Sequence, residues 1–212
     1  GLNGKIFDIL KKCEFEIPFI SNNATSHGIK FEDVAVSIYE KINNIKVMEF
    51  GCIPHLHIPF FGASPDGIIS YDSSNKDYVG RMLEIKCPYS RKIDGVIKPE
   101  YFSQMQGQLE VCDLEYCDFL ECDLQKFKSR DDYFKSNSEH KGIILELYNL
   151  RLKKPIYYYC NEDFNTNENK VIEWEDNNLE QIFGNDDLEY TTTTYWYLNK
   201  INIILVKRDR DY

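Results

Sequence analysis

The sequence predicts an α/β fold in which a central mixed β-sheet is flanked by helices. Apolar residues recur at helical spacing between Ser26 and Asn43, and a second helix is expected to open at Pro99. Between these two segments, short apolar runs alternate with Gly, Pro and Asp, which is typical of strands joined by turns. Helices that enclose a run of strands in this way favour a layered α/β domain.

The first predicted helix runs from Ser26 to about Asn43. Ser26 or Asn23 is expected to cap its start, and Glu32 suits the positive end of the helix dipole. Its apolar side chains fall at offsets 0, 3, 4, 7, 8 and 11, which places them on one face: Phe31, Val34, Ala35, Ile38, Tyr39 and Ile42.

The remaining elements are predicted mostly as strands. Before the second helix, an antiparallel meander is expected over residues 46–50, 55–61, 67–71 and 79–86. After it, the pattern predicts strands over 116–122, 143–148 and 155–159, a helix over 173–183, and one or two strands over 191–206. Residues 1–212 are expected to form a single domain with a core at about 26–122, which residues 140–212 complete or decorate.

Composition indicates a folded protein of a reducing compartment. The chain has 42% hydrophobic and 28% charged residues, and it has no run of about 18 apolar residues that could span a membrane. Its first residues lack the features of a signal peptide, and seven cysteines are an odd number. We therefore expect an intracellular, cytoplasmic protein with reduced thiols. The spacing of Cys112, Cys117 and Cys122 leaves a metal cluster as the lesser alternative.

The net charge of −10 argues against a nucleic-acid partner, because proteins that bind polyanions usually have a basic surface. The acidic residues, however, are concentrated in the C-terminal half. One stretch is basic, with Lys86, Arg91, Lys92 and Lys98 against the single acid Asp94. Carboxylates that bind a divalent metal are also partly neutralised by it. A nucleic-acid substrate therefore remains compatible with the charge.

The strongest chemical signal is Ser64-Pro65-Asp66-Gly67 followed by Leu83-Glu84-Ile85-Lys86-Cys87-Pro88. Residues two apart on a strand share a face, so Glu84 and Lys86 are expected to point the same way. If the hairpin brings Asp66 beside them, two carboxylates converge, which favours a divalent cation such as Mg²⁺. A bare E-x-K pair is usually only an exposed ion pair, so the prediction depends on the combination with Asp66.

Two further motifs accompany this pair. Gly28 to Ala35 has the pattern G-x-x-x-E-x-x-A around Glu32, and Tyr101 to Gln106 has the pattern Y-x-x-Q-x-Q. In this order and spacing, the motifs resemble the lambda-exonuclease-like, viral-recombinase (YqaJ-type) branch of the PD-(D/E)xK nucleases. The resemblance covers residues 26–122 and implies a restriction-endonuclease-like core.

The resemblance also implies a site. Its metal ligands fall on Asp66, Glu84, the backbone carbonyl of Ile85, and Glu32 as ligand or water-holder. Lys86 is expected to activate water, and Gln104 is expected to position the scissile phosphate. The expected substrate contacts are Tyr101, Gln106, Arg91 and Lys92, although Gln106 lies on the opposite face of its helix from Tyr101 and Gln104.

The implied cofactor is Mg²⁺, with Mn²⁺ as a substitute and two ions in the site. The implied partners are double-stranded DNA, a single-strand annealing protein and a homotrimer, and the expected location is the host cytoplasm if the protein is viral. The activity expected is that of an exonuclease on duplex ends in recombination, repair or viral genome processing. The basic pocket that some relatives use for a 5′ phosphate has no arginine counterpart in residues 1–25, which leaves 5′ specificity open.

Other readings stay open at this point. A structure-specific or restriction-like endonuclease would share the same core. A catalytically silent DNA-binding recombination module would be marked by a broken acid and lysine set, which is intact here, and a chance match in an acidic interaction protein would bind no metal. His55 and His57 share a strand face and could bind zinc, but no third ligand is evident.

Overall fold

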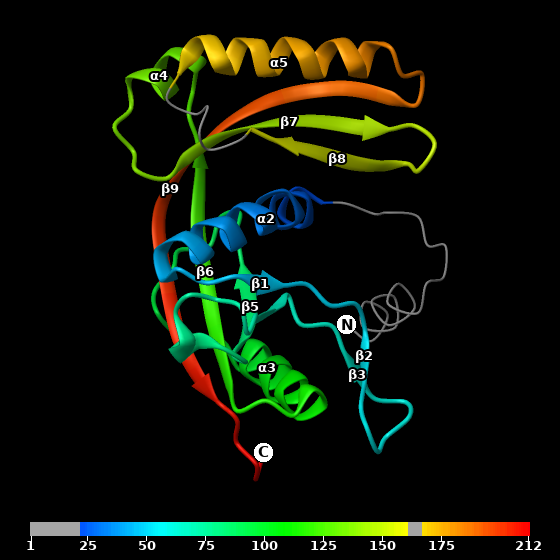
Figure 1. Cartoon of the computed structure of the whole chain (residues 1–212), viewed down its shortest axis with the longest axis vertical. Coiled ribbons are helices and arrows are strands. Elements are labelled where there is room, and N and C mark those ends of the chain that lie inside the picture. Colours follow the sequence, from blue (N-terminus) through cyan, green and yellow to red (C-terminus); the bar gives the residue numbers. More distant parts are fainter. Residues whose placement is uncertain (1–21, 161–166) are drawn as a thin grey trace. The chain divides into compact units, whose positions relative to one another are not determined.

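The computed structural model describes residues 22–160 and 167–212 (Figure 1). The described residues fall into two compact units, which we call the core unit (22–123 and 200–212) and the insert unit (124–160 and 167–199). Strands β6 (Tyr116–Lys126) and β9 (Leu188–Lys207) contribute residues to both units. The single domain expected from the sequence stays a prediction.

The core unit contains a mixed sheet, as predicted. Its strand order is β1-β4-β5-β6-β9, where β1 is Val47–Met48, β4 is Gly67–Ile69 and β5 is Met82–Lys86. The β1–β4 and β4–β5 pairs are antiparallel, which confirms the meander, whereas β5 and β6 are parallel. A short 3-10 helix, Lys76–Tyr78, lies in the connection from β4 to β5.

Helix α2 (Asn23–Asn43) confirms the predicted helix and buries its apolar face, except that Ile42 near its end is exposed. Its cap differs from the prediction, because the side chain of Asn22 accepts the bond from the Thr25 amide. Near the other end, the Tyr39 hydroxyl donates a 2.5 Å hydrogen bond to buried Asp118 of β6. Apolar burial and this bond together hold α2 against the sheet.

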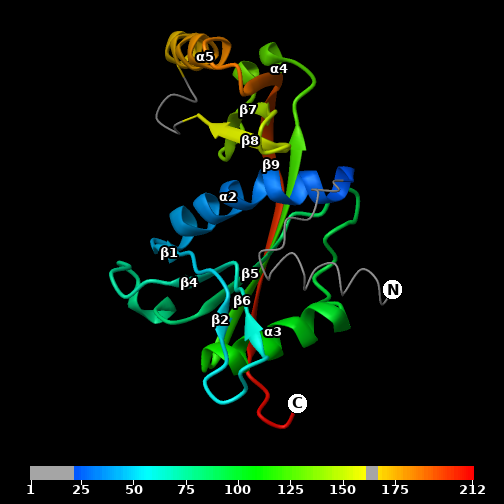
Figure 2. The same ribbon diagram turned by 90° about the vertical axis from the view of Figure 1, so that its right-hand side faces the viewer.

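The strand expected over 55–61 was wrong. The structure has a hairpin of β2 (Ile53–Pro54) and β3 (Gly62–Ala63), and residues 55–61 form its loop. The cause is His55, whose Nδ1 atom accepts the backbone N–H groups of His57 and Ile58 and so turns the chain. The hairpin contacts helix α3 (Pro99–Cys112), and Figure 2 shows it in front of that helix.

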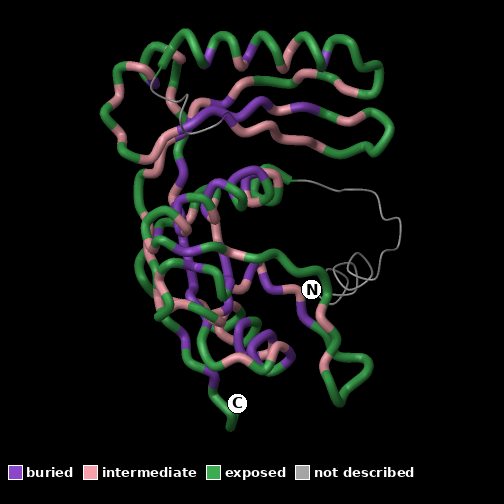
Figure 3. Tube along the Cα trace, viewed as in Figure 1, coloured by how far each residue is buried: buried purple, intermediate pink, exposed green. Residues whose placement is uncertain are grey.

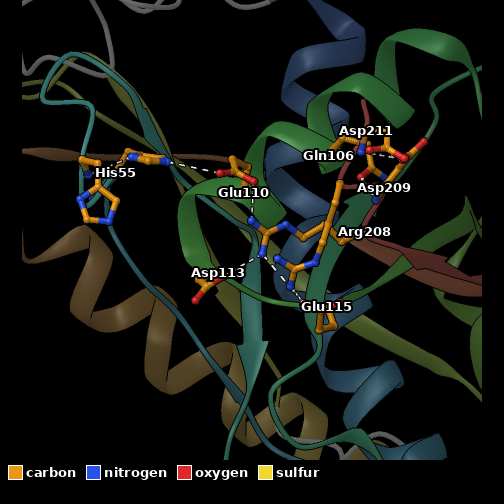
Figure 4. Close-up of polar contacts among 10 residues, drawn as sticks. His55, Gln106, Glu110, Asp113, Glu115, Arg208, Asp209 and Asp211 are labelled. Atoms are coloured by element: carbon orange, nitrogen blue, oxygen red, sulfur yellow. Dashed lines mark hydrogen bonds and ion pairs between the residues drawn. The ribbon is translucent and has the colours of Figure 1, made fainter.

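Helix α3 begins at Pro99, as predicted, and ends before Asp113, which adopts a left-handed conformation with φ of 50°. The chain after β9 returns to this helix (Figure 4). The buried side chain of Arg208 binds Glu110 and, over 2.8 Å, Asp113. The C-terminal segment is thereby fastened to the end of α3.

The insert unit pairs β7 (Lys141–Asn149) antiparallel with both β8 (Lys154–Tyr159) and β9. The predicted last helix is α5 (Glu168–Phe183), which starts earlier than expected because Asn167 caps it. The six-residue helix α4 (Arg130–Lys135) was not expected. Apolar side chains of α5 and the sheet form the buried interior of this unit. Figure 3 shows the buried stretches of β7 in purple.

No helix among residues 22–160 and 167–212 combines the length and the apolar character needed to cross a membrane.

Candidate active site

The catalytic candidates meet at the β4–β5 pair of the core unit. Gly67 pairs with Leu83, so the residue before Gly67 lies beside the middle of β5. There, Oδ2 of Asp66 accepts the backbone N–H of Ile85 over 2.7 Å. Glu84 and Lys86 flank Ile85 on the same face of the strand. The predicted convergence of Asp66, Glu84 and Lys86 is therefore realised in the fold.

Glu84 is fully buried, and its two carboxylate oxygens differ in their contacts. Oε1 accepts hydrogen bonds from the Lys86 ammonium and, over 2.8 Å, from Nε2 of Gln104. Oε2 is buried and has no hydrogen-bond partner within the described part of the chain. A buried anionic oxygen without a donor is costly unless a cation is bound there. The donor set fits Mg²⁺, which commonly takes one or two carboxylates.

Burial and neighbouring charges shift the pKa values of the side chains in the site. Burial and the adjacent Glu84 carboxylate raise the pKa of Asp66 to about 7, against the opposing effects of the Ile85 amide and Lys86. Burial alone would lower the pKa of Lys86, but the charge and hydrogen bond of Glu84 outweigh it and raise that pKa. Lys86 therefore stays protonated at neutral pH.

Glu32 lies on α2 beside this pair and remains exposed. Partial enclosure and the charge of Asp33 raise the pKa of Glu32, and Glu84 acts in the same direction while Lys86 opposes it. In residues 22–160 and 167–212, no three His, Cys, Asp or Glu side chains are grouped so that they could hold a metal ion. The candidate cation site therefore consists of the carboxylates of Asp66 and Glu84. Glu32 lies at its edge, where its alternative role is to hold a water molecule.

The sequence also suggested a zinc site at the histidine pair and a metal cluster at the cysteines. His55 and His57 do not belong to a three-ligand group, and Nδ1 of His55 is occupied by backbone N–H groups. All six cysteines in the described residues are free thiols, and they provide no metal group either. Burial raises the pKa of both Cys117 and Cys122, which is typical of inert interior thiols.

A cavity of about 370 Å³ opens beside the acidic pair. It lies between the first turns of α2 and the chain that leaves β5, and Glu32, Lys86 and Arg91 supply its charged walls. Tyr101 closes another side, with its ring 5.1 Å from Nζ of Lys86 and 5.8 Å from Nζ of Lys98. Two ammonium groups near one aromatic ring make this wall electropositive.

Two predicted substrate contacts are not brought to the cavity. Nε2 of Gln106 donates to the Lys207 carbonyl over 3.0 Å, and its Oε1 accepts the Asp209 amide over 2.7 Å, so its side chain fastens the C-terminal segment (Figure 4). Lys92 is exposed and does not line the cavity. Their roles in binding DNA stay predictions, as do the Ile85 carbonyl ligand and the Gln104 contact with phosphate.

Two residues near the site were not among the predicted site residues. Nε2 of buried Gln108 donates to the Ser64 carbonyl over 3.4 Å, in the loop that leads to Asp66. Its position on the Tyr101 and Gln104 face of α3 was the available signal. Glu121 of β6 binds Arg91, and no motif indicated it because 30 residues separate the two. Residues 1–25, in which the sequence offers no arginine for a 5′-phosphate pocket, lie mostly outside the described residues, so 5′ specificity stays open.

Two acids and a lysine on an antiparallel pair of a mixed sheet, in the order Pro65-Asp66 and Glu84-Ile85-Lys86, define a site of the PD-(D/E)xK class. A family model for YqaJ-like viral recombinase domains matches residues 3–115. The chain belongs to this family.

Known proteins resemble the chain to different extents. It is 30% identical over 236 residues to the uncharacterized protein R354 of Acanthamoeba polyphaga mimivirus, a match that covers 96% of this chain and 43% of that protein. The chain thus spans less than half the length of this curated relative. A crystal structure of LHK-Exo in complex with dAMP is 24% identical, with a TM-score of 0.46 over 86% of this chain and 85% of that one. A second, of the alkaline exonuclease LHK-Exo from Laribacter hongkongensis, is 25% identical, with a TM-score of 0.43 over 78% and 76%.

Proposed function

We propose that this chain is a metal-dependent deoxyribonuclease that hydrolyses phosphodiester bonds of duplex DNA, acting as an exonuclease at DNA ends in recombination, repair or viral genome processing. Its family membership supports a role in recombination. The observation that carries the proposal is the buried Glu84 carboxylate, which has one oxygen bonded to Lys86 and Gln104 and the other without a donor in the described residues.

The acidic pair supports the choice of cofactor. Asp66 and Glu84 would hold Mg²⁺, or Mn²⁺ in its place, and a second ion would require Glu32 or substrate oxygens to complete its ligands. Burial and the adjacent Glu84 carboxylate raise the pKa of Asp66, and Lys86 does not offset them. A divalent cation bound there polarises the phosphoryl group and makes a bound water more acidic.

Lys86 has a separate task in this proposal. Because Glu84 keeps it protonated, its ammonium can donate to the attacking water and to phosphoryl oxygens but cannot accept a proton. Gln104 keeps the Glu84 carboxylate in one orientation through its 2.8 Å bond. Glu32, exposed at the edge with a raised pKa, is suited to hold water and to take up its proton.

The substrate is proposed from the walls of the cavity. Lys86, Arg91 and the Tyr101 ring offer cationic and aromatic surface next to the acidic pair. Cationic side chains bind phosphate oxygens, and aromatic rings stack on bases. Action at ends, a single-strand annealing partner and a ring-shaped homotrimer are proposed only from the family resemblance.

The test is digestion of linear and covalently closed circular duplex DNA with Mg²⁺, compared with the same reactions in EDTA. We expect wild-type protein to degrade the linear DNA only, and Glu84→Gln and Lys86→Met to lose at least about a hundredfold in rate. Asp118→Asn is the matched control, because it also removes a buried carboxylate but one that binds Tyr39 and Arg81.

Each other outcome has a defined meaning. Cleavage of closed circles would replace the exonuclease with an endonuclease. Full activity of both active-site variants would overturn the assigned site. DNA binding without digestion in either Mg²⁺ or Mn²⁺ would replace the enzyme with the silent recombination module.

A further inference from the structure

Arg91 lies in the irregular chain that follows β5 and lines the cavity together with Glu32 and Lys86. An arginine in such a loop loses much side-chain entropy when its guanidinium is fixed in one place. This guanidinium is nevertheless fixed, because its Nη2 atom donates a 2.6 Å hydrogen bond to Oε1 of Glu121. Its side chain is only 25% exposed.

Glu121 is fully buried on β6, directly opposite Lys86 in the parallel β5–β6 register. Its second oxygen, Oε2, accepts a 3.1 Å hydrogen bond from Nδ2 of Asn202 on β9. The carboxylate on β6 is therefore held by hydrogen bonds from β9 and from the loop that follows β5. A charge-assisted bond to a rigidly held carboxylate defines the position of the arginine more precisely than its own loop does.

The guanidinium still has donors to spare. It carries five N–H groups, and within the described residues only the bond to Glu121 and a 3.4 Å contact with the Lys92 carbonyl use any of them. Because Arg91 lines the cavity, the remaining donors are available to a ligand inside it. A planar fork of N–H groups matches the paired oxygens of a phosphate.

We propose that Glu121 is a positioning residue, whose buried carboxylate holds Arg91 at the cavity wall so that its remaining N–H groups bind a phosphate of the DNA backbone. This inference rests on the proposed nuclease function and extends it to a residue with no contact to the substrate. Asn202 acts with Glu121, since it fixes the orientation of the same carboxylate.

A purely structural role makes a different prediction. If the Glu and Arg pair only neutralises a charge in the interior, its loss lowers the stability of the fold and leaves the affinity for DNA unchanged. The insert unit offers a matched example in Glu175, which is buried and pairs with Nη1 of Arg130 over 3.1 Å. Glu175→Gln is therefore the control for the loss of a buried pair.

The experiment is a double-mutant cycle of Glu121→Gln and Arg91→Met. For each protein, KM and kcat for linear duplex DNA are measured with Mg²⁺, and Kd is measured by fluorescence anisotropy with Ca²⁺ at several salt concentrations. We expect Arg91→Met to raise KM and Kd about tenfold and Glu121→Gln roughly threefold or more. The double variant should be no worse than Arg91→Met alone, because Glu121 acts through Arg91.

Salt dependence supplies an independent readout. Loss of one phosphate contact lowers the slope of log Kd against log salt by about 0.9. We expect this decrease for Arg91→Met, a partial decrease for Glu121→Gln, and none for Glu175→Gln. Asn202→Ala should raise KM in the same direction by a smaller factor, and it replaces Glu121→Gln in the comparison if that variant does not fold.

The positioning role is overturned if Glu121→Gln and Asn202→Ala lower the melting temperature but keep the wild-type KM, Kd and salt slope. Additive effects of Glu121→Gln and Arg91→Met on Kd would also overturn it. If wild-type protein does not digest DNA, the proposed nuclease function fails, while the Kd cycle still decides the role of Glu121. If wild-type protein digests DNA and the cycle is additive, only the positioning role fails.

Discussion

The amide of Gln104 and the ammonium of Lys86 bind the same oxygen of Glu84, with a distance of 2.8 Å from Nε2 of Gln104. Both groups donate to Oε1, and Oε2 has no hydrogen-bond donor among the described residues. Gln104 comes from α3 and Lys86 from β5, so the carboxylate is oriented from two elements. This arrangement makes the helix a part of the proposed metal site.

Gln104→Leu should therefore weaken metal binding as well as catalysis. Loss of a charge-assisted hydrogen bond costs about 1.5–3 kcal/mol, so we expect the Mg²⁺ concentration for half-maximal rate to rise at least about tenfold. The measurement is the rate of DNA digestion across a Mg²⁺ titration. Glu100→Gln, an exposed change on the same helix, is the control. An unchanged Mg²⁺ requirement in Gln104→Leu would remove this residue from the site.

Metal affinity should also depend on pH. Because burial and Glu84 raise the pKa of Asp66 to about 7, its carboxylate is largely protonated below that value and must lose the proton to bind a cation. At low Mg²⁺, activity should fall as pH decreases through about 7. At saturating Mg²⁺ the midpoint should move to lower pH, because the cation displaces the proton. A midpoint that does not respond to Mg²⁺ would assign the titration to another group.

The same shift predicts an effect on stability. A carboxyl whose folded pKa lies above its unfolded value of 3.8 retains its proton in the folded state, so stability decreases as pH rises from about 4 to about 7. Asp66→Asn removes this penalty and can still accept the Ile85 amide. In metal-free buffer at pH 8, we expect its melting temperature to exceed that of wild type by roughly 2–4 °C. At pH 4 the difference should vanish, and equal melting curves at pH 8 would contradict the prediction.

Two glycines of the motifs should respond oppositely to alanine. A Cβ atom on Gly67 would lie 2.3 Å from Cγ1 of Val47, so the Val47 side chain or β1 would have to shift, which costs about 1–3 kcal/mol. A Cβ on Gly28 would meet no atom within 4 Å, and alanine in the helix interior contributes about 0.5–1 kcal/mol. Urea denaturation of Gly67→Ala and Gly28→Ala should show the opposite signs. Two destabilised variants would mean that Gly28 is needed for packing.

The anchor of the C-terminal segment can be tested in the same way. Arg208 is buried, whereas its partners Glu110 and Asp113 are exposed, so Arg208→Met should cost about 1–2 kcal/mol and lower the melting temperature by roughly 2–8 °C. Arg210→Met is the control, because that side chain is exposed and its pair with Glu115 is at the surface. Similar melting temperatures for both variants would show that burial of Arg208 adds nothing.

Much of the core unit follows from local sequence patterns. The apolar spacing of α2 predicts its buried face, and alternation along β5 predicts that Glu84 and Lys86 point together. These properties depend on residues within a few positions of each other. The turn at 55–61 could not be predicted in this way, because the alternating apolar residues there look like a strand and only the ring nitrogen of His55 decides the outcome.

Long-range polar contacts were beyond the sequence for a different reason. Glu121 and Asn202 are 81 residues apart, and Arg208 and Glu110 are 98 apart. Any of the many acids in this chain could have been their partner, and no local pattern selects one. Gln106 illustrates the same limit, since its amide is used by the backbone of the C-terminal segment rather than turned toward the cavity.

The boundaries of the insert unit both fall within strands, at Asp123 of β6 and Lys200 of β9. These strands are neighbours, and the backbone bonds from Arg208 to Glu115 and from Phe127 to Tyr195 show that they run in opposite directions. The chain therefore leaves the core unit along β6 and returns to it along the antiparallel neighbour β9. Strands β4 and β5, which position Asp66 and Glu84, lie outside this segment of the sequence. The segment can therefore change in length without altering the pairing of these two strands.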